Sequence, residues 1–327
     1  MPLSEFELIQ RYFQQAGLAA DPMQHANVAL GIGDDCALLT VPAGQQLAVS
    51  LDVLVADVHF PATADATLIA ERALAVNLSD LAAMGAQPLG FTLGLTLPKV
   101  DESWLEAFSR GLRNSALRYH CPLLGGDTTR GPLQIAIQIH GTLPVGSALT
   151  RSGANVGDDV YVSGTLGRAG LALAVLRNTL PAANAEQQAE LLRAYYEPEP
   201  RLALGAALRG IATAAQDVSD GVLADLGHIA NRSGKQIVLD ARAIPVAAVV
   251  CALCPPLQAL QLALTAGDEY ELVFTAPQAC RTSIVEPARR CGIELSRIGD
   301  VREGSGVSVL DAAGESLKFA SQGFQHF

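Results

Sequence analysis

The chain has 327 residues, of which 22 are basic and 33 acidic, giving a formal net charge of −11. Hydrophobic residues make up 50% and charged residues 17%, which predicts a folded globular protein long enough for two domains and excludes a disordered chain. The acidic balance excludes nucleic-acid binding through a basic face. It does not exclude a phosphate ligand, because divalent cations can bridge acidic side chains to phosphates.

No targeting or membrane segment is predicted. The amino-terminal stretch carries acidic residues early and lacks a continuous apolar core, unlike a secretory signal. The longest uncharged stretch lies between Arg242 and Asp268, but three prolines interrupt it, so a buried helix is favoured over a membrane span. Cys251 and Cys254 form one isolated C-x-x-C motif, for which packed free thiols are favoured over a zinc or redox site. These features are typical of a cytoplasmic protein.

Hydrophobic periodicity predicts strands and helices mixed along the first half of the chain. The elements expected there are helices over 4–18, 66–85 and 103–120 and strands over 46–55, 90–98 and 132–144. Gly85 is expected to end the second of these helices.

A domain boundary is expected near residues 145–158, which are rich in Gly, Ser and Asn, and we divide the chain into domains 1–148 and 149–327. In the second half we expect a strand from 160, helices over 168–180, 186–194, 201–213 and 221–233, strands over 236–240 and 270–276, a helix over 278–291 and a strand pair near 295–319. This mixture predicts an α/β (α+β) protein of two domains rather than one doubly wound sheet.

Several common catalytic motifs are absent from the sequence. It contains no P-loop, no protein-kinase motif set, no G-x-S-x-G and no H-E-x-x-H. The stretch GTLGRAG at 164–170 follows an expected strand and opens an expected helix, but it lacks the G-x-G start of a dinucleotide loop. A tight strand-to-helix turn is therefore favoured there.

Five apolar stretches end in one or two aspartates beside Gly, Ser or Asn. The aspartates are Asp34, Asp35, Asp52, Asp80, Asp127, Asp217 and Asp220. Each alone reads equally well as a turn residue, a helix cap or a solvated side chain. Burying a carboxylate costs several kcal/mol unless it is paired or binds a metal, and Arg130 is the only basic residue within a few positions of any of them. Together the five motifs therefore favour a hard-cation site, such as one for Mg²⁺ shared with phosphates.

These motifs resemble those of the thiamine-monophosphate kinase family, in order and spacing, across nearly the full length. The matching stretches are LGIGDDCALL, ALAVNLSDLAAMGA, LLGGDTTRGPL, ALTRSGANVGDDVYVSGTLG, DVSDGVLADLGHI, GDEYELVF and the terminal GFQHF. The resemblance also places the chain in a superfamily of ATP-dependent enzymes that includes aminoimidazole ribonucleotide synthetase, selenophosphate synthetase and a hydrogenase maturation protein.

The resemblance implies a homodimer formed through the sheet of the N-terminal domain, a C-terminal α/β domain, and an ATP cleft between the domains with several Mg²⁺ ions. The implied reaction converts ATP and thiamine monophosphate into ADP and thiamine diphosphate, the last step of thiamine diphosphate biosynthesis. The substrate phosphate is already anionic, so in-line attack on the γ-phosphorus needs no general base, and catalysis comes from positioning and charge cancellation.

Site residues are carried over position by position. The resemblance implies metal ligands at Asp35 (with Asp34 beside it), Ser50, Leu51, Asp52, Asp80, Asp127, Asp217 and Asp220. It implies nucleotide contacts at Gly126, Asp127, Arg151 and Ser219, and substrate contacts at His59, Asp268 and Phe324. Asp127, Arg151 and Asp217 are the residues expected to contribute most to catalysis.

Two positions depart from the family pattern. Leu51 stands where the family has threonine, so a ligand there can only be its backbone carbonyl. Asp268 and Glu269 are swapped relative to the family's order, which leaves open which of the two reaches thiamine. Two alternative functions are another enzyme of the superfamily and a regulatory module that binds Mg-ATP without turnover; the Leu51 departure is what favours the second.

Overall fold

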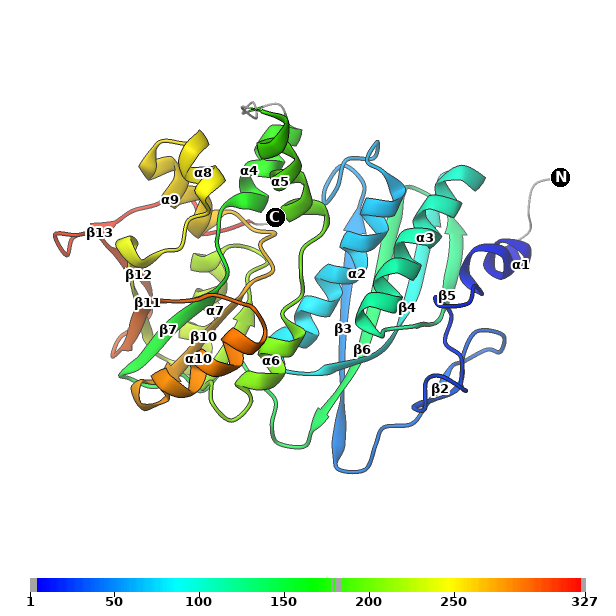
Figure 1. The fold of residues 1–327 in the computed structure, drawn as a ribbon, viewed down its shortest axis with the longest axis horizontal. Helices are drawn as coiled ribbons and strands as arrows, with labels where there is room; N and C mark the ends of the chain where they lie inside the picture. Colours follow the sequence, from blue (N-terminus) through cyan, green and yellow to red (C-terminus); the bar gives the residue numbers. More distant parts are fainter. Residues whose placement is uncertain (1–4, 178, 180–183, 325–327) are drawn as a thin grey trace. The chain divides into compact units, whose positions relative to one another are not determined.

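The computed structural model describes residues 5–177, 179 and 184–324, and the chain divides into two compact units. Unit 1 comprises Met1–Leu81 and Ala86–Gly146, and unit 2 comprises Ala82–Gly85 and Ser147–Phe327. Each unit contains its own sheet with helices packed on it (Figure 1). The predicted mixed α/β class with two domains is confirmed. The last three residues of the terminal GFQHF motif lie outside the described residues.

Unit 1 is built on a four-stranded sheet of order β3-β6-β4-β5, in which β4 and β5 are parallel and the other pairs antiparallel. Its elements are α1 (Glu5–Leu8), the π-helix η1 (Ile9–Phe13), β1 (Val28–Leu30), β2 (Leu38–Leu39), β3 (Gln45–Val55), α2 (Ala66–Ala83), β4 (Gln87–Leu97), α3 (Glu102–Tyr119), β5 (Leu123–Arg130) and β6 (Gln134–Pro144). Strands β1 and β2 pair separately as a small two-stranded sheet.

Alternation along β6 determines which face of this sheet is covered. Ile135, Ile137 and Ile139 are fully buried, whereas Gln138 between them is exposed. Helices α2 and α3 pack side by side over the buried face (Figure 1), and Asn114 of α3 donates a hydrogen bond to Glu71 of α2 at 3.0 Å. The sheet of unit 1 therefore has one face toward the helices and one face away from them.

The predicted helices of unit 1 are confirmed except at the amino terminus. Gly85 adopts a φ of +68° just after α2, as its expected role in ending the helix requires. The helix expected over 4–18 instead ends at Phe13, which corrects that prediction. Leu18 is fully buried, and its carbonyl accepts a hydrogen bond from the N–H of Leu123 at 2.8 Å, so this segment runs beside β5 instead of continuing the helix.

Unit 2 is built on a seven-stranded sheet of order β13-β12-β9-β11-β7-β10-β8. Its elements are β7 (Asp158–Ser163), α4 (Arg168–Leu176), α5 (Ala185–Tyr196), α6 (Leu202–Leu208), β8 (Ala214–Asp217), α7 (Val222–Ser233), β9 (Gln236–Asp240), η2 (Ala241–Ala243), α8 (Ala248–Leu253), α9 (Pro256–Thr265), β10 (Leu272–Pro277), η3 (Gln278–Cys280), α10 (Arg281–Arg290), β11 (Leu295–Arg302), β12 (Gly306–Leu310) and β13 (Ser316–Leu317). Apart from the pair β9–β12, the strands pair antiparallel.

Both faces of the seven-stranded sheet are buried. Val160 and Val162 of β7 belong to a hydrophobic cluster with α7 and α9, whereas Tyr161 between them belongs to a second cluster with α6 and α10. The uncharged stretch after Arg242 forms α8 and α9 within this packing. Across the described residues, no helix has both the length and the apolar character that a membrane span requires.

Four predictions for unit 2 need correction. The helix expected over 168–180 ends at Leu176. The helix expected over 201–213 ends at Leu208, and Gly210 follows with a φ of +73°, which turns the chain toward β8. The helix expected over 278–291 becomes regular only from Arg281. The strand pair expected near 295–319 consists of three strands, β11 to β13.

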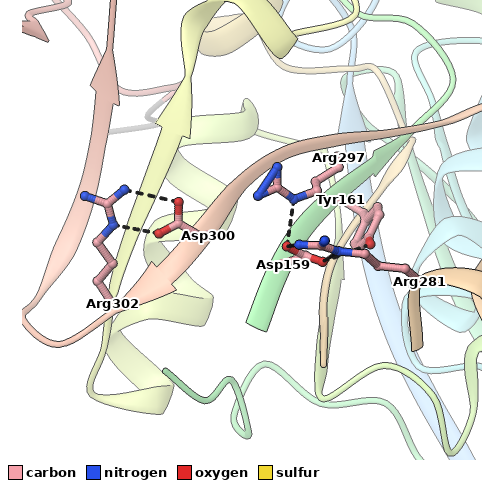
Figure 2. Close-up of polar contacts among 6 residues, drawn as sticks. All are labelled: Asp159, Tyr161, Arg281, Arg297, Asp300 and Arg302. Carbon is pink, nitrogen blue, oxygen red and sulfur yellow. Dashed lines mark hydrogen bonds and ion pairs between the residues drawn. The ribbon is translucent and has the colours of Figure 1, made fainter. Parts of the chain in front are cut away.

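Asp159 of β7 is a buried carboxylate shared by two arginines (Figure 2). Arg281 donates to it from Nε at 2.6 Å and from Nη2 at 2.8 Å, and Arg297 donates from Nε at 2.7 Å. The hydrogen bonds from Arg281 lower the pKa of Asp159 by more than burial raises it. Together with the hydrogen bond from Arg297, they bring this pKa to about 2. This group ties β7, β11 and α10 together.

Asp159→Asn is expected to lower the free energy of unfolding by about 1–2 kcal/mol near neutral pH, since both guanidinium groups are half exposed and partly screened. A pKa lowered by folding stabilises the native state above about pH 4, and this contribution is lost as the pH falls toward 2. Urea denaturation at about pH 7 and about pH 3 checks this, because the difference between variant and parent should shrink in acid. Asp300→Asn, which removes the more exposed pair with Arg302 (Figure 2), is the control and should change little.

Candidate functional site

Two aspartates and a serine from β3 and α2 come together in unit 1. The Oγ of Ser50 donates a hydrogen bond to Oδ2 of Asp80 at 2.5 Å, and Asp52 lies close enough to Asp80 for their charges to repel. The N–H of Asp52 is bonded to Oδ1 of Asn77, a fully buried residue of α2, at 3.2 Å. We call Ser50, Asp52 and Asp80 the β3–α2 oxygen group.

The β3–α2 oxygen group fits a divalent cation by its donor chemistry. Burial, together with the neighbouring carboxylate of Asp80, raises the pKa of Asp52 to about 7. The three side chains offer only hydroxyl and carboxylate oxygens, the ligands that Mg²⁺ prefers. A bound divalent cation would offset the repulsion between the two carboxylates, the smaller of the two causes of this raised pKa.

Leu51 lies between two members of this group but points to the other face of the sheet. Its side chain is 57% exposed, and it is in register with the exposed Gln138. Ser50 and Asp52 are in register with the buried Ile139 and Ile137 on the helix-covered face. A ligand at Leu51 is therefore restricted to its backbone carbonyl.

The GDD and GGD motifs line one cavity of about 880 Å³ in unit 1. Asp34 and Asp35 contribute from the segment before β2, and Gly126 and Asp127 contribute from β5. Gln138 also lines the cavity, so it lies on the sheet face turned away from α2 and α3. The structure therefore groups Asp35 with Asp127, but no residue of the β3–α2 oxygen group is among the described residues lining this cavity.

Gly126 occupies a position that a side chain would disrupt. Its φ is +156°, and a Cβ atom there would overlap the backbone carbonyl of Leu93 on β4. The close approach of β5 to β4 at this point sets the position of the adjacent Asp127. By contrast, a Cβ on Gly125 would meet nothing within 4 Å.

In unit 2 three segments far apart in sequence meet beyond the end of β8. The N–H of Asp268 donates to the carbonyl of Ser219 at 2.9 Å, and the N–H of Phe324 donates to the carbonyl of Asp220 at 2.9 Å. Gly267 makes this possible, because a Cβ there would overlap the carbonyl of Ser219. The structure thus brings together five of the residues that the resemblance implied as site residues, namely Asp217, Ser219, Asp220, Asp268 and Phe324.

Asp225, His228 and Arg151 also adjoin this part of unit 2. Within the described part of the chain, Asp220, Asp225 and His228 are the one group of three or more His, Cys, Asp or Glu residues whose ligand atoms lie within 4.8 Å of one another. Burial and the charge of Asp220 raise the pKa of Asp225 to about 7, while backbone hydrogen bonds and the charge of Arg151 oppose that rise. The predicted Arg151 therefore lies within electrostatic reach of this group.

Asp268 and Glu269 make different contacts in the structure. Glu269 accepts hydrogen bonds from the N–H groups of Gly167 at 2.8 Å and Ala169 at 3.1 Å, at the start of α4. Burial raises the pKa of Glu269 to about 8. Glu269 therefore holds the start of α4, whereas the backbone N–H of Asp268 is bonded to Ser219 and its Oδ1 accepts a hydrogen bond from the hydroxyl of Tyr270 at 3.3 Å.

His59 belongs to a turn of unit 1 after β3. Its Nδ1 accepts a hydrogen bond from the N–H of Val55 at 3.0 Å, and the neighbouring Phe60 is buried. This bond leaves a proton on Nε2 when the ring is neutral, so the ring can donate a hydrogen bond. Its contact with a substrate remains a prediction.

Asn77 and Asp225 are functional candidates that were not predicted from the sequence, although a sequence feature marks both. Each is a polar residue at an apolar position of an expected helix, and each is fully buried. Both hydrogen-bond to backbone N–H groups of predicted site residues, Asp52 and Asp220 respectively. A polar residue at an apolar position of an expected helix, one or two helical turns from a motif aspartate, is the feature that identifies them.

Comparison with known proteins places these motifs in a family. The model for "AIR synthase related protein, N-terminal domain" matches residues 33–143, and that for the C-terminal domain matches residues 155–312. The chain is 44% identical over 327 residues to the thiamine-monophosphate kinase of Escherichia coli (strain K12), covering 100% of this chain and 99% of the relative. It is 32% identical over 333 residues to that of Bacillus subtilis (strain 168), covering 99% and 100%.

Solved structures agree with these relatives. The crystal structure of thiamine-monophosphate kinase from Stenotrophomonas maltophilia K279a has a TM-score of 0.87 and 43% identity, covering 97% of this chain and 99% of that one. The structure of AaThiL complexed with AMPPCP and TMP has a TM-score of 0.76 and 28% identity, covering 100% and 99%. By fold, motifs and identity over its whole length, the chain belongs to the thiamine-monophosphate kinase family of AIR synthase related proteins.

Proposed function

We propose that this protein is a thiamine-monophosphate kinase, which transfers the γ-phosphate of ATP to thiamine monophosphate to give thiamine diphosphate and ADP. The observation that carries the proposal is 44% identity over the full chain to a thiamine-monophosphate kinase. A related structure holds AMPPCP and TMP, in keeping with ATP and thiamine monophosphate as the two substrates here. The reaction is the last step of thiamine diphosphate biosynthesis.

Oxygen ligands in each unit are proposed to hold Mg²⁺. In unit 1 these are Asp35, Ser50, Asp52, Asp80 and Asp127, with the backbone carbonyl of Leu51, and in unit 2 they are Asp217 and Asp220. Bound Mg²⁺ supplies neutralisation of the phosphate charges during transfer. The chain itself contributes rigid placement of these oxygens, through Asn77 beside Asp52 and the close strand approach at Gly126.

Other residues are proposed to bind the two substrates. Gly126, Arg151 and Ser219 are assigned to the nucleotide, and Arg151 adds positive charge for its phosphates. His59, Asp268 and Phe324 are assigned to thiamine monophosphate. The substrate phosphate attacks as an anion, so the mechanism requires no side chain to remove a proton. Residues 1–148 would then bind metal and ATP and form the dimer, with nucleotide and substrate contacts added by residues 149–327.

Phe324→Ala is expected to raise the KM for thiamine monophosphate about tenfold with a smaller change in kcat. The ring is 45% exposed, and an aromatic face of this kind stacks on a flat cationic ring. Steady-state kinetics at saturating ATP measures both constants. Phe324→Tyr keeps the ring and should retain the parental KM; an unchanged KM in the alanine variant would remove Phe324 from the substrate site.

A homodimer is proposed from the exposed face of β3. Leu47, Val49, Leu51 and Val53 alternate along this strand and are each 39–57% exposed, so they form an apolar stripe on the sheet face turned away from the helices. A continuous apolar stripe on an edge strand is typical of an interaction surface.

Val49→Asp is expected to convert a dimer into monomers, because it places a charge at the centre of this stripe. Sedimentation velocity of the parent and the variant measures the change. Leu117→Asp, at an equally exposed apolar position on α3, is the matched control and should keep the parental mass. A variant at Val49 that stays dimeric would place the interface elsewhere.

The experiment that tests the function follows ADP release from Mg-ATP with and without thiamine monophosphate, with thiamine diphosphate measured by chromatography. Thiamine diphosphate formed in equal amount to ADP is the expected result. ATP binding without any product would instead favour the regulatory module, and ADP release without thiamine diphosphate would favour a different acceptor. We also propose a cytoplasmic location, since the six cysteines are free thiols, as in a reducing compartment.

A further inference from the structure

Asp225 lies beside the proposed site but has no role in the function described so far. It stands in the first turn of α7 and is fully buried. Aspartate is rarely buried without partners, because the loss of hydration must be offset by hydrogen bonds or opposite charge. The bonds that Asp225 makes therefore indicate what it does.

The carboxylate of Asp225 is bonded to both ends of one loop. Its Oδ2 accepts hydrogen bonds from the N–H groups of Asp220 at 3.1 Å and Gly221 at 3.0 Å. Its Oδ1 accepts a hydrogen bond from Nε2 of Gln216 at 2.6 Å. Gln216 precedes the loop on β8, and Gly221 leads into α7. One side chain thus connects the end of β8 to the start of α7 across the Asp217–Asp220 loop.

We infer that Asp225 is a positioning residue, which fixes the Asp217–Asp220 loop so that its carboxylates are already in place when a divalent cation binds. The inference rests on the proposed function for the use of that cation. A carboxylate that accepts three hydrogen bonds has little remaining capacity to bind a cation itself. The spacing of Asp225 and His228 around Asp220 is therefore better explained by a brace than by a third ligand.

Two substitutions at this one position separate a brace from a ligand. Asp225→Ala removes all three hydrogen bonds. Asp225→Asn can keep them, because its Oδ1 can accept from the backbone while its Nδ2 faces Gln216. The Oε1 of Gln216 is buried and has no hydrogen-bond partner among the residues that the structure describes, so rotating that amide would let it accept from the new NH₂ group.

The first measurement is calorimetric binding of AMPPCP to the whole protein at a series of Mg²⁺ concentrations. The second is amide hydrogen exchange of residues 217–221 in the absence of Mg²⁺. Asp225→Ala should raise the Mg²⁺ concentration for half-maximal binding about tenfold or more and speed exchange in the loop. Asp225→Asn should stay within about threefold of the parent and keep the slow exchange.

Other outcomes overturn the inference. An equal rise in both variants would make Asp225 a metal ligand, since both lose the charge. Parental Mg²⁺ dependence in both would leave Asp225 a purely structural residue. Ile229→Val, at a buried position of α7, controls for lost stability alone and should not alter the Mg²⁺ dependence. If Asp225→Ala does not fold, Gln216→Leu removes one bond and should give a smaller rise in the same direction.

This test is independent of the proposed reaction. It uses no thiamine monophosphate, so a parent protein that forms no thiamine diphosphate can still show the expected Mg²⁺ and exchange behaviour. Failure of the proposed function would appear in the product assay, whereas failure of the brace would appear in the comparison of the two Asp225 variants.

Discussion

Asp80→Asn is expected to lower kcat by about 100-fold or more while leaving the fold intact. Asp80 accepts the hydrogen bond from Ser50, and its charge acts on Asp52, so it interacts with both other members of the β3–α2 oxygen group. Asparagine can still accept the bond from Ser50 but brings no negative charge for a cation. Removing one of two repelling carboxylates should also keep or raise the thermal unfolding temperature in the absence of Mg²⁺.

The measurement pairs steady-state kinetics with thermal unfolding of the same preparations. Glu106→Gln is the matched control, because it removes the same charge from an exposed position on α3 of the same unit. It should keep both the parental kcat and the parental unfolding temperature. Near-normal turnover by Asp80→Asn would exclude Asp80 from the metal ligands.

Gly126→Ala is expected to reduce turnover about 100-fold and to lower the unfolding temperature by several degrees. The added methyl group would overlap the carbonyl of Leu93, so β5 would have to move away from β4. That movement displaces Asp127, which follows directly. The φ of +156° adds strain for any residue with a side chain.

The neighbouring Gly125→Ala provides the control for this prediction. Its Cβ would meet nothing within 4 Å, so its unfolding temperature should match that of the parent. Thermal unfolding of both variants, together with kcat for Gly126→Ala, tests whether the strand approach positions Asp127. Equal stability of the two alanine variants would contradict the argument.

Long periodic elements could be predicted from the sequence, whereas short polar strands could not. α3 and β6 repeat apolar residues with a clear period, and α2 is a long, largely apolar stretch ended by Gly85; the structure confirms all three within a few residues. β5 and β8 were missed as strands, because LLGGDTTR contains two glycines and AAQD is only four residues long. Their strand conformation depends on hydrogen bonds to β4 and β10, which lie far away in sequence.

The motif aspartates could be identified from the sequence, but their grouping could not. The resemblance implied that Asp35, Asp52 and Asp127 are all metal ligands. The structure places Asp52 on the helix-covered side of its sheet and the other two at a cavity on the opposite side. Which side α2 would cover is a tertiary property that periodicity within α2 does not determine. The different surroundings of Asp268 and Glu269 likewise depend on the contact of Glu269 with the start of α4, which lies far away in sequence.

Successive side chains of β3 point to opposite faces of the sheet, so mutations on one face need not affect the other. Substitutions at Leu51 alter the apolar stripe and leave the side chains of Ser50 and Asp52 untouched, so the two sets of positions can vary independently. Insertion or deletion of one residue has the opposite effect. It would turn the carboxylate of Asp52 into the apolar stripe and a leucine toward Asp80. The gain or loss of a single codon would therefore disrupt the apolar stripe and the β3–α2 oxygen group together.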